Sequence, residues 1–222
     1  MAGYEGRLNV LASNLANIST NGFKRELVTA QESQIQRRLG PVSGVTNESL
    51  VDFTQGNLIR TGRDLDLALD GSGFFAVEGE GGQLYTRDGS FHLTGEGVLV
   101  ADDGRAVAWE RQSGFIDATG LPVMVRADGE VRQGDQTIGT LRIVDFEDPH
   151  QLSRTADGYW LAPPDLDEAI PTANVHQGAL EASNANPIEE LIEMIALQRS
   201  FESVNSTFSG LTETFQRLTR PF

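Results

Sequence analysis

The chain has 222 residues, and its 32 acidic and 17 basic side chains give a formal net charge of −15 at pH 7. It contains no cysteine, which excludes a disulfide framework and a thiolate metal site. Residues 1–40 carry a net charge of +2 and residues 187–222 of −2, so the acidic excess lies between them. An acidic surface of this kind would repel nucleic acid and anionic lipid. No apolar run is long enough to cross a bilayer, and no basic–apolar–small leader opens the chain.

The first predicted element is an amphipathic helix near the N-terminus. Leu8, Leu11, Leu15 and Ile18 recur at steps of three and four, which is the spacing of a narrow apolar stripe along one helix face. We expect this helix to end near Asn21–Gly22, because glycine adopts the left-handed cap that terminates helices. Three turns are marginal in isolation, so the stripe predicts a partner helix.

Residues 25–60 have no clear period, and Gly40–Pro41 is a strong break. This stretch predicts an extended connector with one strand at Ser49–Thr54. From Leu65 the period becomes two, which places the aspartates between 64 and 70 on the wet face of a strand. Turn signals every 8–12 residues then predict a sandwich or barrel-like β-module over residues 61–176. Its later strands are expected at Phe74–Val77, Leu84–Phe91, Val98–Val100, Leu121–Arg126, Glu130–Gln133, Leu141–Phe146 and Tyr159–Ala162.

The last predicted element is a long helix with a strong start signal. Asn186 can cap it, Pro187 suits its first position, and Glu189 completes a capping pattern. One apolar stripe runs through Met194, Leu197, Phe201, Val204, Phe208, Leu211, Phe215 and Leu218. Ile188, Leu191, Ile192 and Ile195 add apolar residues on a further face, which predicts burial by more than one neighbour.

The predicted fold is therefore a mainly β central module flanked by N- and C-terminal helices that pair as a coiled-coil-like element. We expect a helical region formed by residues 1–24 and 177–222, a connector over 25–60 and the β-module over 61–176. The predicted assembly interface comprises Leu8, Leu11, Leu15, Ile18, Ile188, Leu191, Met194, Ile195, Leu197, Phe201, Val204, Phe208, Leu211, Phe215 and Leu218. The pattern alone is equally compatible with pairing inside one molecule and packing between subunits.

Several segments resemble one known family. They are LNVLASNLANISTNGFK at residues 8–24, DFTQGNL at 52–58, YTRDGSF at 85–91, GALEASNAN at 178–186 and QRSFE at 198–202. The chain resembles the bacterial flagellar rod and hook proteins in these segments, from Leu8 to about Phe208. Residues 198–202 and the short connector before the last helix resemble the proximal-rod members more than the distal-rod ones, which remain the alternative. The resemblance places Met1 inside the family's first helix, so we expect the opening turns of that helix to be missing.

The resemblance implies a structural subunit without an active site, cofactor or metal. Its terminal helices would form an inner tube around the export channel, with the β-module outside, and the rod would transmit torque across the periplasmic space. The implied partners are further copies, neighbouring rod proteins and the flagellar type III export apparatus, which exports subunits without a cleaved signal peptide. Neither nucleic acid nor direct membrane insertion is expected. In this family both ends are disordered before assembly.

Few residues suggest chemistry. His92, His150 and His176 are far apart in the sequence and lack the spacing of metal ligands. The aspartates near Asp64 and Asp70 lack the order of oxygen ligands in a calcium loop. Paired carboxylates are common in so acidic a chain, and no pair is singled out. A secreted module that binds or acts on polysaccharide is the alternative from another functional class, and specific glycan binding by the acidic region would favour it.

Overall fold

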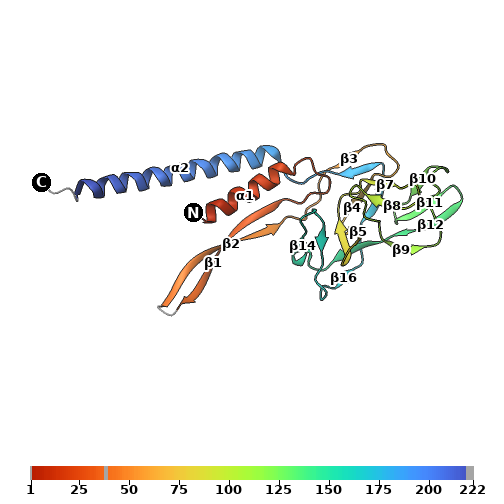
Figure 1. Cartoon of the computed structure of the whole chain (residues 1–222), viewed down its shortest axis with the longest axis horizontal. Coiled ribbons are helices and arrows are strands. Elements are labelled where there is room, and N and C mark those ends of the chain that lie inside the picture. The colour runs from red at the N-terminus through yellow and green to blue at the C-terminus, as the bar shows by residue number, and fades with distance from the viewer. Residues whose placement is uncertain (1, 38–39, 219–222) are drawn as a thin grey trace. The chain divides into compact units, whose positions relative to one another are not determined.

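In the computed structural model, residues 2–37 and 40–218 are described, and the chain forms two compact units. We call Met1–Ala16, Glu26–Leu50 and Ala185–Phe222 the terminal unit, and Asn17–Arg25 and Val51–Asn184 the central unit. The fold is mainly β, with one helix near each end of the chain, as predicted (Figure 1). No helix in the described part of the chain is both long and apolar enough to span a membrane.

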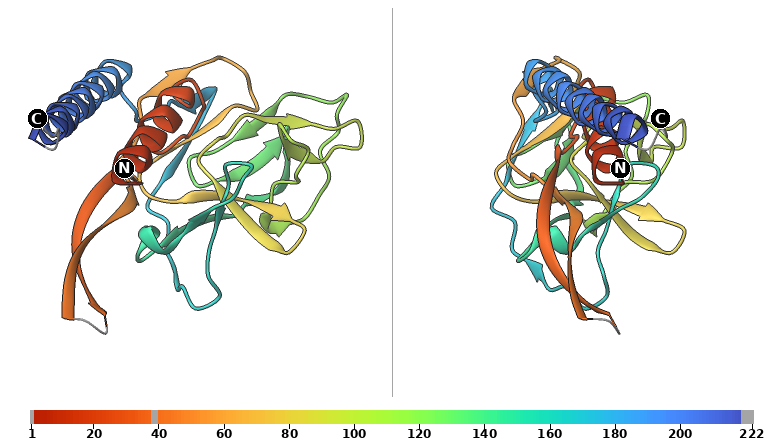
Figure 2. Two further views of the ribbon diagram at one scale, coloured as in Figure 1. Left: turned by 60° about the vertical axis from the view of Figure 1, so that its left-hand side comes forward. Right: turned by 90° about the vertical axis from the view of Figure 1, so that its left-hand side faces the viewer.

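The terminal unit contains both helices and most of a long strand pair. Its elements are α1 (Ala2–Ala16), β1 (Glu26–Arg37), β2 (Gly40–Val51) and α2 (Pro187–Leu218). The β1 and β2 strands pair with each other as a ribbon, which is clear in the further views (Figure 2). The prediction of one strand at Ser49–Thr54 was wrong in number and extent, because two long strands occupy this stretch and the second already ends at Val51. An unpaired extended chain leaves its backbone polar groups to water, whereas pairing satisfies them within the protein.

The central unit is built from antiparallel sheets. The largest has the order β14-β15-β6-β5-β13-β16, with bounds Ser153–Arg154, Trp160–Leu161, Gly82–Thr86, Phe74–Gly79, Ile143–Phe146 and Glu168–Ala169. A second has the order β10-β11-β12-β9, with bounds Val123–Val125, Glu130–Gln133, Gln136–Leu141 and Trp109–Gln112. Three strand pairs complete the unit: β17 (Asn174–Gln177) with β4 (Leu67–Asp70), β18 (Ala179–Glu181) with β3 (Leu58–Arg60), and β7 (Phe91–Leu93) with β8 (Leu99–Ala101).

Two hydrophobic cores lie on opposite faces of β5. Phe75 belongs to one core, where its ring meets that of Phe91 edge to face at 5.2 Å. Phe74, the preceding residue, belongs to the other core, which also contains Phe146 and Trp160. Because successive side chains of a strand point to opposite faces, one dipeptide supplies both cores. A strand that is buried on both faces shows no polar alternation, which explains why Phe74–Val77 is continuously apolar.

Most predicted strands of the β-module are confirmed, and Glu130–Gln133 agrees to the residue. Leu141–Phe146 instead contains the end of β12 and the whole of β13. The expected alternation around Leu67 was wrong, because Leu67, Ala68 and Leu69 are all buried. Asp66, expected on the wet face, is also buried, and its carboxylate pairs with the guanidinium of Arg63 at 2.8 Å.

Candidate assembly surface

The side-chain amide of Asn14 joins three elements of the terminal unit. In α1 this residue is fully buried, and its Oδ1 accepts a hydrogen bond from the backbone N–H of Glu26 in β1 at 2.9 Å. Its Nδ2 donates to the backbone carbonyl of Glu26 at 2.8 Å and to the carboxylate of Glu190 in α2 at 3.1 Å. The side-chain amide of Asn14 thus satisfies both backbone polar groups of Glu26 at the start of β1, as a paired strand would, and it also links α1 to α2.

Apolar contacts extend this link along α1 and α2. The ring of Tyr4 stacks on that of Phe201, with centroids 4.4 Å apart and planes inclined by 24°. Leu11 is buried, and Leu8 and Leu15 are half-buried. On α2, Met194 and Leu197 are half-buried like Phe201. These residues occupy one face of each helix, and α1 and α2 contact each other within the single chain.

The structure places the other predicted interface residues in three different settings. Ile188, Leu191, Ile195, Val204 and Phe208 are exposed. The side chains of Leu211, Phe215 and Leu218 lie outside the residues whose side chains the structure describes. Ile18 is not in the first helix, because α1 ends at Ala16 and residues 17–25 belong to the central unit. The expected helix end near Asn21–Gly22 was wrong by five residues, although Gly22 does adopt a positive φ of 64°.

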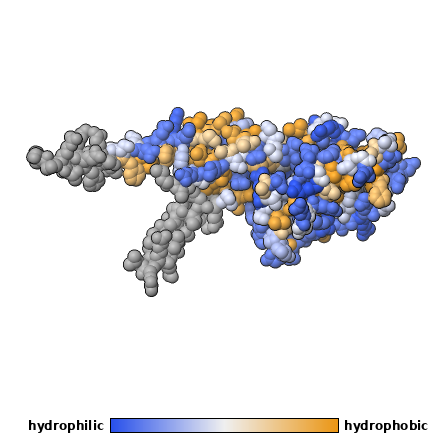
Figure 3. Space-filling view, viewed as in Figure 1, coloured by the Kyte–Doolittle hydropathy of each residue, from blue (hydrophilic) through white to orange (hydrophobic). Residues whose placement is uncertain are grey.

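The first turns of α2 carry a second apolar stripe opposite the first. Ile188, Leu191, Ile192 and Ile195 lie within about 100° of each other around the helix, on the side away from Glu190 and Met194. All four are exposed, Ile188 to 67%. Apolar side chains gather over α1 and the first half of α2 on the surface seen in Figure 3. A contiguous apolar surface of this kind marks an interaction site.

The start of α2 is capped as the sequence predicted. The side-chain oxygen of Asn186 accepts a hydrogen bond from the backbone N–H of Ile188 at 3.0 Å, and its amide nitrogen donates to Glu189 at 3.3 Å. Pro187 occupies the first helical position, where its missing N–H costs nothing. The cap fixes the residue at which the apolar stripes of α2 begin.

A buried ionic cluster lies in the central unit, where segments distant in sequence meet. The ammonium of Lys24 is 2.7 Å from Oε1 of Glu181, and the guanidinium of Arg87 is 3.2 Å from Oε2 of the same carboxylate. We call these three residues the Glu181 cluster. The side chains of Lys24 and Glu181 are fully buried, and that of Arg87 is nearly so. Such charges are stable in the interior only when they remain paired and hydrogen-bonded.

Backbone groups complete the bonding of the Glu181 cluster. Lys24 donates to the carbonyl of Thr54 at 2.8 Å, and the N–H of Gly56 donates to Oε1 of Glu181 at 2.9 Å. The carbonyl of Glu181 accepts from the N–H of Gly22 at 2.7 Å. Burial lowers the pKa of both cations, and pairing with Glu181 opposes this shift. The cluster therefore ties together residues from both ends of the sequence and from the segment after β2.

Asn184 makes a second link at the same place. Its Oδ1 accepts from the N–H of Arg25 at 2.7 Å, and its Nδ2 donates to the carbonyl of Asp52 at 2.8 Å. The N–H of Asp52 in turn donates to the carbonyl of Arg25 at 2.8 Å. Together with the bond from the N–H of Gly22 to Glu181, these bonds tie residues 22–25 to distant parts of the central unit, which is the physical reason that the first helix does not continue to Gly22.

Asp88, the residue after Arg87, is expected to make the stability of the central unit depend on pH. Burial raises the pKa of Asp88, although Ser90 donates two hydrogen bonds to Oδ1. A carboxyl whose pKa is raised by folding makes the native state less stable as the pH rises from its unfolded-state pKa through its folded-state pKa. We expect Asp88→Asn, which keeps an oxygen for Ser90, to be more stable than the original chain at about pH 7. Urea unfolding should show the gain shrinking towards about pH 4, near the ordinary pKa of aspartate. A less stable variant at pH 7 would contradict this expectation.

Several polar residues that organise both units were missed by the sequence analysis. Asn14, Lys24 and Glu181 all lie in the quoted motifs, yet hydropathy patterns register only apolar residues. One signal in the sequence could have indicated a buried polar residue. Asn14 lies between Leu11 and Leu15, within the apolar stripe of the first helix. Trp160 lies in one hydrophobic core, and Trp109 packs against the other.

The histidines give no sign of a metal site. His92 and His176 are exposed, and each lies near one aspartate, at 3.7 Å from Asp102 and 3.4 Å from Asp70 respectively. Among the residues that the structure describes, no group of three or more His, Asp or Glu side chains could hold a metal ion.

Three protein-family models match the chain. Flagellar basal body rod FlgEFG protein C-terminal matches residues 176–220, Flagellar hook protein FlgE/F/G D1 domain matches 68–133, and Flagella basal body rod protein matches 6–24. The C-terminal match includes Glu181 and the whole of α2, and the N-terminal match includes Asn14 and Lys24. Asn14, Lys24 and Glu181 thus lie in matched segments, and so do the apolar stripes of both helices.

Curated relatives match nearly the whole chain. The flagellar basal-body rod protein FlgF of Caulobacter vibrioides is 36% identical over 214 residues, which cover 93% of this chain and 87% of the relative. FlgG of Buchnera aphidicola subsp. Acyrthosiphon pisum is 32% identical, with 96% and 93% covered. FlgG of Bacillus subtilis is 29% identical, with 98% and 94% covered. The chain belongs to the flagellar basal-body rod protein family, represented by FlgF and FlgG, and is a structural subunit of the rod.

Proposed function

We propose that this subunit polymerises through a surface made by α1 and α2, with the helices pairing as a coiled-coil-like element in the axial core of the rod. The observation that carries the proposal is the second stripe of α2, formed by Ile188, Leu191, Ile192 and Ile195. It is exposed in the single chain, on the side of α2 away from Phe201. Helices that are apolar on two sides are stable in water only when a further neighbour covers the second side.

The length of α2 supports the same proposal. With 32 residues it extends about 48 Å, whereas the 15 residues of α1 extend about 22 Å. Val204 and Phe208 continue the stripe that meets α1, but they remain exposed. Burying one such side chain contributes roughly 1.5–3 kcal/mol. A neighbouring subunit that covers these residues would therefore gain substantial free energy from a few contacts.

In this proposal the helices surround the export channel and the central unit lies outside. The rod stands in the periplasmic space and transmits torque, and the subunit reaches it through the flagellar type III export apparatus. Its partners are further copies of itself and neighbouring rod proteins. The Glu181 cluster supports a mechanical role, because it joins segments from both ends of the sequence within the central unit.

We further propose that the chain is a proximal-rod protein of the FlgF type. The alignments to two FlgF relatives extend over 214 and 212 residues, close to the length of this chain. Those to two FlgG relatives extend over 247 and 252 residues, more than the 222 residues present here, so FlgG carries additional segments. A distal-rod identity would instead be supported if the purified chain formed long homopolymers.

The direct test is replacement of the native copy by an epitope-tagged chain in the source bacterium. Purified basal bodies should contain the tag in the rod, and cells should remain motile. A matched strain that lacks the chain should form no complete rod. Motile cells whose basal bodies exclude the tagged chain would contradict the proposed function.

A further inference from the structure

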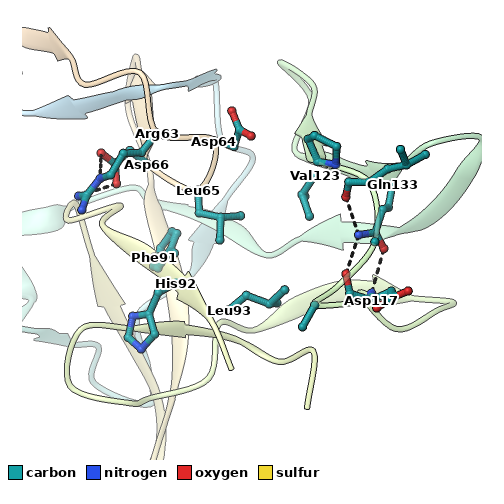
Figure 4. A pocket seen from close by; sticks show the side chains of 14 residues that line it. Arg63, Asp64, Leu65, Asp66, Phe91, His92, Leu93, Asp117, Val123 and Gln133 are labelled. Carbon is teal, nitrogen blue, oxygen red and sulfur yellow. Dashed lines mark hydrogen bonds and ion pairs between the residues drawn. The ribbon is translucent and has the colours of Figure 1, made fainter. Parts of the chain in front are cut away.

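A pocket of about 500 Å³ lies within the central unit, away from the Glu181 cluster. Its lining comes from the segment before β4, from β7 and from the loop that leads into β10. Figure 4 shows Leu65 and Leu93 pointing into the space between these elements. Together with Phe91, Leu121 and Val123 they make an apolar interior. Leu121 is 65% exposed, so part of this apolar surface faces solvent.

The rim of the pocket is acidic. Asp64 and Asp117 are both exposed at its edge. Hydrogen bonds from the backbone and hydroxyl of Thr119 lower the pKa of Asp117 and keep its carboxylate ionised. Arg63 also lines the pocket, but its guanidinium is paired with the carboxylate of Asp66 at 2.8 Å. The charge presented to an incoming group is therefore negative.

The wall beside Asp117 is held in place before any partner arrives. The side-chain amide of Gln133 accepts from the N–H of Asp117 at 2.9 Å and donates to the carbonyl of Leu121 at 2.7 Å. These bonds are drawn in Figure 4 and fix both ends of the loop between the two residues. A pre-formed wall lowers the entropy that binding would otherwise lose in ordering the loop.

A second copy of the central unit is a poor occupant. Ile170, its most exposed large aliphatic side chain among the described residues, is 89% exposed but follows closely after Asp167 and Glu168. Repulsion between those carboxylates and the carboxylates of Asp64 and Asp117 would oppose association. The acidic excess of residues 41–186 has the same consequence for the rest of the surface. Charge complementarity instead favours a cationic partner.

We propose that this pocket binds an extended segment of a different protein, in which a large apolar side chain is flanked by lysine or arginine. The apolar side chain enters between Leu65 and Leu93, and the cations lie against Asp64 and Asp117. This contact is separate from the helix surface, so it stands or fails independently of the proposed polymerisation. The central unit would then bind a partner different from the subunits that cover the helices.

The test uses the full chain and a fluorescent, acetylated pentapeptide with leucine between two lysines. Fluorescence anisotropy should show saturable binding. Two control peptides, one with glutamate in place of both lysines and one with alanine in place of leucine, should bind more weakly. The double variant Asp64→Asn and Asp117→Asn should weaken binding of the first peptide roughly fivefold, since two exposed ion pairs are lost. The matched variant Asp165→Asn and Asp167→Asn makes the same change of charge away from the pocket and should bind as the original chain does.

Four results would overturn the proposal. The first is absence of binding by the lysine-flanked leucine peptide, and the second is equal binding of all three peptides. The third is equal weakening by the two double variants, which would mean only a general attraction to an acidic protein. The fourth is unchanged binding by the Leu121→Ser variant, which changes an exposed residue and should leave folding intact.

Discussion

Replacement of Glu181 by alanine is expected to unfold the central unit or to lower its stability by about 3–5 kcal/mol. The substitution leaves Lys24 and Arg87 buried in the central unit without their shared carboxylate. It also removes the acceptor of the Gly56 N–H. A buried cation that has lost its partner keeps the whole cost of leaving water. Urea unfolding followed by tryptophan fluorescence measures the change, because Trp160 lies in a core of the same unit.

Glu168→Ala is the matched control for this result. Glu168 pairs with Arg142 at 2.7 Å, but the carboxylate is 44% exposed, so its loss should change stability by no more than about 1 kcal/mol. Glu181→Gln should fall between the two, because it keeps the side chain's volume and one acceptor while losing its charge. Equal stability of Glu181→Ala and Glu168→Ala would show that the buried cluster does not hold the central unit together.

Phe201→Asp is expected to abolish incorporation into the rod while leaving the central unit folded. Phe201 stacks on Tyr4 between α1 and α2, and its removal loses roughly 1.5–3 kcal/mol of apolar burial. The new carboxylate also brings an unpaired charge into an apolar contact. Incorporation is measured from the content of purified basal bodies, and folding from the urea transition of the purified chain.

Ser200→Asp controls for the added charge. Ser200 is exposed and precedes Phe201, so its substitution adds the same charge beside the contact with Tyr4 rather than within it. We expect its incorporation to exceed that of Phe201→Asp by a wide margin. Normal incorporation of Phe201→Asp would contradict the assignment of the helix surface to assembly. A lost urea transition for that variant would contradict the independence of the central unit from this helix contact.

The sequence was most informative where the structure follows a regular period or a local signal. The stripe from Met194 to Phe201 was visible because helical spacing repeats, and the start of α2 because Asn186 and Pro187 act over three residues. The strands at Phe74 and Glu130 were found because turns bound them. Each of these features depends on neighbours in sequence, which is why pattern analysis detects it.

Long-range polar contacts could not be predicted in the same way. Lys24 and Glu181 are 157 residues apart, and Asn14 and Glu190 are 176 apart. Nothing in local composition indicates that such residues become buried together. The same limit explains why Ile18 was wrongly assigned to the first helix. Its spacing continues the apolar stripe, although α1 ends at Ala16. Backbone bonds of the following segment to distant residues, such as Gly22 to Glu181, assign it to the central unit instead.

Accessibility of a single thiol at position 195 tests the helix surface most directly. The chain has no cysteine, so Ile195→Cys introduces a unique thiol on the second stripe of α2. Ile195 is 49% exposed in the single chain, and a maleimide should label the variant monomer rapidly. In purified basal bodies the same thiol should resist labelling until the rod is denatured, because a neighbouring subunit covers it. Equally rapid labelling in monomer and intact basal body would contradict assembly through this face of α2.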